Sequence, residues 1–201
     1  MEHIANHIDL IGSLASAPQF SHDNHGRRFF SFFLEVERLS GTIDRLPVLA
    51  SEQLLRTTAA QEGDALHITG QIRSFNSRTP GRHRLIISVL AEQMSVCGEP
   101  HDNLAVLTGV ICKEPVYRRT PLGREICDVM LAVNRPYRRA DYIPCILWGR
   151  TAQEAAAFPV GTTLTLTGRL QSRDYLKLLG SESEQRTAYE VSVITAEAVN
   201  G

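Results

Sequence analysis

The 201-residue chain has few cysteines, and they are not paired in the sequence. Cys97, Cys112, Cys127 and Cys145 lie 15, 15 and 18 residues apart, without a C-x-x-C motif. This spacing argues against a structural zinc site and against a small disulfide scaffold. We therefore expect reduced, mostly buried thiols.

Long apolar runs are also absent. No stretch approaches the roughly 18 consecutive apolar residues that a membrane-spanning helix needs. The N-terminus has no basic segment of the kind that begins a signal peptide. The sequence therefore predicts a cytoplasmic protein without a membrane partner.

Motifs of catalysis are missing too. The chain has no nucleophile elbow, no phosphate-binding glycine loop and no H-E-x-x-H motif. Six of the seven histidines lie before residue 100, and none follows His101. His22, Asp23 and His25 fall in the turn-rich run SHDNHG, which is more typical of a surface loop than of a metal site. We expect no enzyme activity, no cofactor and no metal.

The net charge is only −1, but the charges are unevenly distributed. Residues 1–100 hold nine basic and eleven acidic side chains, whereas residues 101–201 hold twelve and eleven. Between Arg118 and Arg150 there are seven arginines against three acidic residues. A local basic field of this kind can attract a polyanion whatever the overall charge.

Within this basic region, residues 131–150 read LAVNRPYRRADYIPCILWGR. Two apolar strands flank a short basic loop. Along the whole segment, arginines are interleaved with the flat side chains of Tyr137, Tyr142 and Trp148. Cations that follow phosphates and rings on which bases stack are typical of single-stranded nucleic-acid binding. The alternative is a β-hairpin with half-buried tyrosines and solvated arginines, in which Trp148 is a core or interface ring.

The two halves of the sequence match each other. A shift of 97 residues aligns Gly12 with Gly109, and a shift of 98 aligns the fourth strands. Further pairs are Arg38 with Arg135, Asp44 with Asp141, Pro47 with Pro144, Gly70 with Gly168, and Ser74 with Ser172. The sequence predicts a duplicated domain, with domains at 1–98 and 104–201 and a linker at 99–103.

Each copy reads as five strands with one short helix. The expected strands are residues 8–14, 29–36, 46–50, 66–70 and 85–89 in the first copy, and 104–111, 126–133, 143–148, 164–168 and 189–193 in the second. In the second copy, Thr151 to Glu154 is a capping-box pattern that predicts the start of the helix. A helix between the third and fourth strands is the order of the OB-fold. The fold class is therefore all-β, with two tandem five-stranded OB-fold barrels that bend at glycines 12, 70, 109 and 168.

The second copy resembles the bacterial single-stranded DNA-binding protein family. The resemblance covers nearly all of residues 104–199 and rests on PVYRRTPLG, LAVNR, ADYIPCILWGRTA, GRLQSRDY and YEVSVITAEAV. It implies sequence-nonspecific binding of single-stranded DNA, which is protected during replication, repair or recombination. It also implies that bases stack on Tyr137, Tyr142, Trp148 and Tyr175. Basic residues on the same loops and strands are expected to neutralise phosphates: Arg118, Arg119, Arg135, Arg138, Arg139, Arg150, Arg169, Arg173 and Lys177.

The first copy lacks these rings. Its matching positions are Ser40, Arg45, Ser51 and Ser77, whereas its phenylalanines crowd residues 29–33. We interpret the first domain as mainly a structural partner that stands in for a second subunit. Its hairpin is expected to add phosphate contacts through arginines 73, 78, 82 and 84.

The resemblance also implies an assembly. Family members commonly combine four barrels, so a chain with two barrels is expected to form a homodimer, for which the phenylalanine strand is one candidate surface. An acidic C-terminal recruitment tail is expected from the family but is not seen in this sequence. The alternative function is an OB-fold adaptor of a primosome-like complex that binds DNA weakly or not at all.

Overall fold

A computed structural model gives the fold of the chain and describes residues 6–77, 84–179 and 182–199. None of the helices in these ranges is long and apolar enough to cross a membrane. The first half forms β1 (Asn6–Leu14), β2 (Gln19–Asn24), β3 (Arg27–Glu37), β4 (Ile43–Ser51), α1 (Glu52–Thr58), β5 (Ala65–Asn76) and β6 (Leu85–Val96). The second half forms β7 (Asp102–Ile111), β8 (Val116–Arg119), β9 (Glu125–Arg135), β10 (Arg139–Trp148), α2 (Gly149–Ala155), β11 (Thr163–Leu179) and β12 (Glu182–Ala198).

Each half closes into a five-stranded barrel. In the first, β1 pairs with β5, β5 with β6, β6 with β4, β4 with β3, and β3 returns to β1. The second repeats this circuit with β7, β11, β12, β10 and β9. The helices α1 and α2 lie between the third and fourth barrel strands. The predicted fold of two tandem OB-fold barrels is confirmed.

The core follows the alternation of the strands. Along β5, every second residue from Leu66 to Ser74 is buried, and the apolar members among them point into the barrel, as period-2 spacing requires. Two glycines allow close approach of strands at the bends. A Cβ on Gly70 or Gly168 would lie 2.0 or 2.5 Å from the carbonyl oxygen of Leu90 or Ser192, so only glycine fits there.

Two local features differ from the sequence prediction. Short strands β2 and β8 pair with β3 and β9 in segments that we expected to be loops. The capping-box prediction is wrong, because α2 begins at Gly149 and no side chain caps it. Gly149 has a φ of 55°, so the chain turns directly after β10 and Thr151 lies inside the helix.

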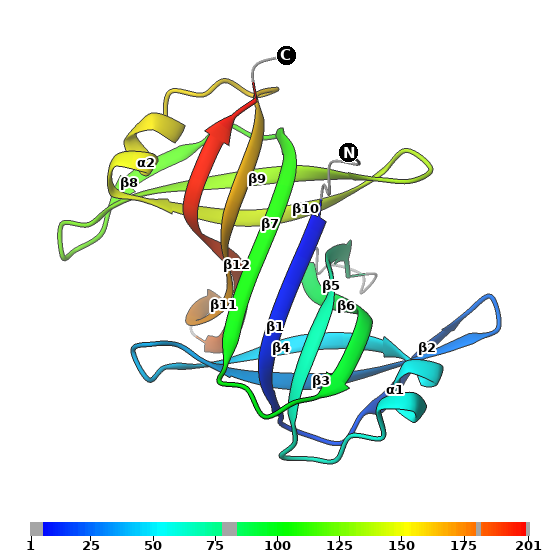
Figure 1. Cartoon of the computed structure of the whole chain (residues 1–201). Coiled ribbons are helices and arrows are strands. Elements are labelled where there is room, and N and C mark those ends of the chain that lie inside the picture. Colours follow the sequence, from blue (N-terminus) through cyan, green and yellow to red (C-terminus); the bar gives the residue numbers. More distant parts are fainter. Residues whose placement is uncertain (1–5, 78–83, 180–181, 200–201) are drawn as a thin grey trace.

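The barrels are joined through their first strands. β1 and β7 pair antiparallel from Asn6 opposite Leu107 to Ile11 opposite Asp102, and Figure 1 shows them side by side between the two barrels. This pairing merges both barrels into one twelve-stranded sheet. β1 and β7 each hydrogen-bond to their own barrel as well, so the two barrels are held by backbone contacts at the centre of the molecule.

Two further contacts between the barrels are related by the internal repeat. The buried Asp44 accepts hydrogen bonds from the backbone N–H and the hydroxyl of Ser172 at 2.7 and 2.9 Å. The buried Asp141 accepts one from the backbone N–H of Ser74 at 2.7 Å. Asp44 with Asp141 and Ser74 with Ser172 are matching positions of the two copies. The residues that repeat at these positions therefore make equivalent contacts between the barrels.

Candidate nucleic-acid interface

The outer face of β10 carries two of the predicted rings. The inward-facing residues Asp141, Ile143, Cys145 and Leu147 are buried. Tyr142 and Trp148 therefore point outward from the same face, with exposed fractions of 45 and 39 %, whereas Ile146 between them on that face is 6 % exposed. Six residues of strand separate them by about 20 Å. Two flat side chains at this spacing leave room for several nucleotides between them.

Each end of this face is anchored. The indole Nε1 of Trp148 donates a hydrogen bond to the hydroxyl of Ser192 on β12, at 3.0 Å. The backbone N–H of Tyr142 donates to the hydroxyl of Ser74 in the first barrel, at 2.6 Å. The first contact fixes the plane of the indole ring. The second fixes the strand while leaving the Tyr142 ring exposed.

Tyr137 lies at the tip of the hairpin between β9 and β10. Its ring is 94 % exposed, and both Tyr137 and Arg138 have left-handed backbone conformations, with φ of 63° and 54°. Such conformations cost about 1–2 kcal/mol per non-glycine residue. Strain of this kind often accompanies functional loops, and here it presents a ring and a cation side by side to solvent.

Tyr175 lies on a different hairpin from Tyr137. It is on the part of β11 that pairs with β12 beyond the barrel, opposite Arg186. Arg186 is six residues from Ser192 on β12, so Tyr175 lies about 20 Å along that strand from the partner of Trp148. The guanidinium of Arg173 lies 5.7 Å from the centre of the Tyr175 ring. The four predicted rings therefore follow the surface of the second barrel and do not form one compact site.

Five of the nine predicted cations are held by carboxylates. Bonds to Asp128 and Glu190 raise the pKa of Arg118 and Arg173 further above its usual value. The five ion pairs are Arg118–Asp128 at 2.7 Å, Arg119–Glu125 at 3.0 Å, Arg135–Asp141 at 3.5 Å, Arg150–Glu154 at 2.9 Å and Arg173–Glu190 at 3.0 Å. Within the described ranges the remaining four, Arg138, Arg139, Arg169 and Lys177, have no acidic partner.

Arg135 and Arg73 have a structural partner that sequence reasoning missed. Both contact the carboxylate of Asp141, which is fully buried, at 3.5 and 3.1 Å. A buried charge needs such partners to offset its desolvation. The sequence repeat matches Arg135 with Arg38 and Asp141 with Asp44. In the first barrel, Arg38 and Asp44 form the equivalent ion pair, at 2.7 Å.

The first barrel keeps the polar residues that the sequence places at its ring positions. The hydroxyl of Ser51, which matches Trp148, caps α1 by accepting a hydrogen bond from the backbone N–H of Leu54. Arg45 lies 5.2 Å from the centre of the Phe33 ring and pairs with Glu35 at 3.3 Å. Arg84 donates to the carbonyl oxygen of Thr187 at 3.4 Å. Arg78 and Arg82, two further predicted phosphate contacts, lie outside the described residues.

The phenylalanine strand β3 is partly covered. Phe32 points into the barrel and is 3 % exposed. Residues of β2 pack on two of the others, since Phe20 meets Phe30 edge to face at 5.8 Å and His22 stacks on Phe29 at 5.2 Å. The surface that β3 offers to a partner is therefore narrower than the sequence suggests.

The four cysteines are free thiols. Cys127 and Cys145 are buried, and the other two are half-buried. Burial raises the pKa of both buried thiols, which keeps them protonated and unreactive at neutral pH.

Two barrels joined through the antiparallel pairing of β1 with β7 define a tandem OB-fold protein. The model of the single-strand binding protein family matches residues 102–199. Single-stranded DNA-binding protein A of Bacillus subtilis is 36 % identical over 48 % of this chain and 57 % of its own length. Protein B of the same organism is 33 % identical over 48 % of this chain and 87 % of its own length. The chain belongs to the single-strand binding protein family.

The chain spans about six-tenths of the length of several relatives, including protein A and the 35 % identical single-stranded DNA-binding protein 2 of Listeria innocua, of which it covers 62 %. Among solved structures, the wild-type single-stranded DNA binding protein from Thermus aquaticus superimposes with a TM-score of 0.79. The match covers 98 % of this chain and 93 % of that one, at 20 % identity. The likeness extends over both barrels and concerns the fold.

Proposed function

We propose that the chain binds single-stranded DNA without sequence preference and protects it during replication, repair or recombination. The observation that carries the proposal is the outer face of β10, where Tyr142 and Trp148 are both exposed on one side of one strand. Stacking contributes roughly 1–3 kcal/mol per base and accepts any base. Tyr137 on the β9–β10 hairpin and Tyr175 on the β11–β12 hairpin add one ring each.

The phosphates meet the cations that have no carboxylate partner in the described structure. Arg138 and Arg139 lie at the hairpin tip next to Tyr137, and Arg169 and Lys177 lie on β11. Arg118, Arg119, Arg135, Arg150 and Arg173 contribute less, because each must leave an acidic partner before it neutralises a phosphate.

A titration with a poly-dT oligonucleotide tests the proposal. Trp148 is the only tryptophan, so stacking on it quenches the intrinsic fluorescence, and the affinity falls as salt rises. The double variant Tyr142→Ala/Trp148→Ala, followed by anisotropy of a labelled oligonucleotide, is expected to bind at least about 30-fold more weakly, since two stacked bases are lost. Binding that neither quenches Trp148 nor responds to salt would favour the adaptor function.

The assembly is also a proposal. With two barrels in each chain, a homodimer presents the four barrels that the family resemblance implies. Light scattering is expected to give a mass near twice 22.3 kDa. A monodisperse monomer at micromolar concentration contradicts the proposed homodimer while leaving DNA binding intact.

A further inference from the structure

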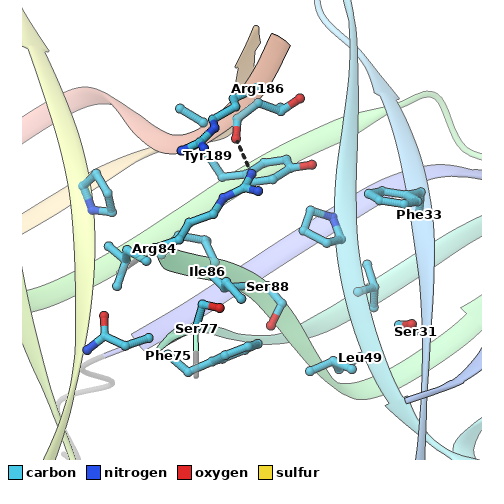
Figure 2. A pocket seen from close by; sticks show the side chains of 18 of the residues that line it. Ser31, Phe33, Leu49, Phe75, Ser77, Arg84, Ile86, Ser88, Arg186 and Tyr189 are labelled. Carbon is cyan, nitrogen blue, oxygen red and sulfur yellow. Dashed lines mark hydrogen bonds between the residues drawn. The ribbon is translucent and has the colours of Figure 1, made fainter. Parts of the chain in front are cut away.

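An open groove of roughly 1020 Å³ lies between the outer face of the first barrel and the β11–β12 hairpin of the second. Three of the rings that line it are Phe33 of β3, 38 % exposed, Phe75 of β5 at 47 % and Tyr175 of β11 at 37 %, and Tyr189 of β12 lines it as well. Figure 2 shows Phe33 on one wall, with Arg84 near the centre and Arg186 across from it. The groove thus combines flat side chains of both barrels.

The charges that line this groove have one sign. Arg84, Lys177 and Arg186 line it, and none of its described lining residues is acidic. Two carboxylates of the hairpin contact its lining residues: Asp174 accepts a hydrogen bond from the hydroxyl of Thr187 at 2.7 Å, and Glu184 pairs with Arg186 at 2.6 Å. The Arg84 guanidinium lies 3.4 Å from the carbonyl oxygen of Thr187, so this cation of the first barrel is next to the hairpin of the second. A lining of rings and cations suits a ligand with bases and phosphates.

The repeat shows how this face differs from its counterpart. Ser31 and Ile86 of the groove match Asp128 and Glu190 of the second barrel. Those two carboxylates hold Arg118 and Arg173. At these two positions the second barrel has carboxylates that hold cations in ion pairs, and the first barrel has none.

Two rings of this groove lie at positions where the second barrel has no ring. Phe33 matches Met130 of the second barrel, and Phe75 matches Arg173. Both phenylalanines point outward, because the buried residues of β3 and β5 alternate with them. The loss of rings at Ser51 and Ser77 is thus offset by rings elsewhere on the same face.

We propose that this groove, formed by Phe33, Phe75, Tyr175 and the cations Arg84 and Lys177, binds a second segment of the same single-stranded nucleic acid. The first barrel then contacts bases directly in addition to supporting the second. The proposal rests on the proposed function, since it extends the path of the strand from Tyr175 onto the first barrel.

The test uses the full chain and the double variant Phe33→Leu/Phe75→Leu, which retains apolar bulk and removes the flat rings. The control is Phe20→Leu, an exposed phenylalanine of β2 that does not line the groove. For a long poly-dT oligonucleotide the double variant is expected to lose at least about tenfold in affinity, and the control less than about twofold. A photo-crosslinking oligonucleotide with iodinated bases is expected to label Phe33, Phe75 or Tyr175 in the wild-type chain.

The outcomes separate the two proposals. If the wild-type chain does not bind the oligonucleotide, the proposed function fails. If it binds, and Tyr142→Ala/Trp148→Ala weakens binding while Phe33→Leu/Phe75→Leu behaves like the control, only the groove proposal is overturned. It is also overturned if the groove variant keeps its affinity but loses a dimeric mass in light scattering, because a second copy of the chain then occupies the groove.

Discussion

Asp44 of the first barrel and Asp141 of the second occupy matching positions, and each reaches into the opposite barrel. Asp44 is 1 % exposed and accepts a hydrogen bond from the backbone N–H of Ser172. Asp141 is fully buried and accepts one from the backbone N–H of Ser74. Asp44 forms an ion pair with Arg38, and Asp141 forms one with Arg135. The two arginines also occupy matching positions of the repeat. The relative placement of the barrels therefore depends on a reciprocal pair of buried charges as well as on the β1–β7 ladder.

Removal of one of these charges is expected to destabilise the chain. Asp141→Ala leaves Arg73 and Arg135 facing each other in a largely buried site, which costs about 3 kcal/mol. Asp128→Ala is the control, since its pair with Arg118 is exposed and contributes at most about 1 kcal/mol. Urea unfolding followed by circular dichroism measures both. Equal losses for the two variants would contradict a special role of Asp141.

The left-handed backbone at the tip of the β9–β10 hairpin is expected to lower stability and to support binding. Arg138→Gly relieves a left-handed conformation that costs about 1–2 kcal/mol and adds the entropic cost of glycine, about 0.5–1 kcal/mol. The free energy of unfolding should rise by about 0.5–1 kcal/mol while the affinity for poly-dT falls. Ala59→Gly is a matched control, because Ala59 caps α1 with a φ of 50°. It should be stabilised similarly and bind normally. A loss of stability in Arg138→Gly would refute the strain.

The salt dependence of binding should report which arginines are free. Each phosphate contact to a single strand contributes about −0.7 to the slope of log K against log salt. Arg138→Ala/Arg139→Ala is therefore expected to reduce the magnitude of the slope by about 1.4. Asp128→Asn releases Arg118 and should steepen the slope by about 0.7. Anisotropy titrations at several salt concentrations give the slopes. No change in Asp128→Asn would mean that the ion pair does not restrain Arg118.

Glu125 is expected to make stability dependent on pH in the acid range. Hydrogen bonds from Tyr117, Arg119 and Gln153 lower the pKa of its carboxyl group below the usual 4.5. The ionised carboxylate therefore stabilises the fold above about pH 4.5, and this contribution disappears as the pH falls through the lowered pKa of the folded state. Thermal midpoints measured downward from pH 6 should fall less steeply for Glu125→Gln than for wild type. Parallel curves would show that the network does not affect folding.

The sequence predicted the regular part of the fold. Strict alternation in β5 and β11, together with the matched glycines, was enough for two OB-fold barrels. The strand β2 was missed because all of its residues are exposed, so its sequence carries no period-2 pattern. The start of α2 was misplaced because the turn at Gly149 depends on where β10 ends. The domain boundaries at residues 98 and 104 remain a prediction.

The rings and cations were predicted as types, but not their partners. Arg118 meets Asp128 ten residues away, and Arg173 meets Glu190 seventeen residues away. Both contacts run between neighbouring strands and depend on register, which local sequence does not specify. For the same reason the groove was missed, because Phe33 and Phe75 come from separate strands and Tyr175 from the other barrel.

Covalent linkage of the barrels has a consequence for behaviour at high dilution. β1 and β7 belong to one polypeptide, so their ladder cannot be lost by dissociation of subunits, whereas a pair of single-barrel chains separates as the concentration falls. The two halves act at an effective local concentration set by the linker. A single copy of the chain therefore keeps two adjoining barrels even where too few molecules are present to assemble further.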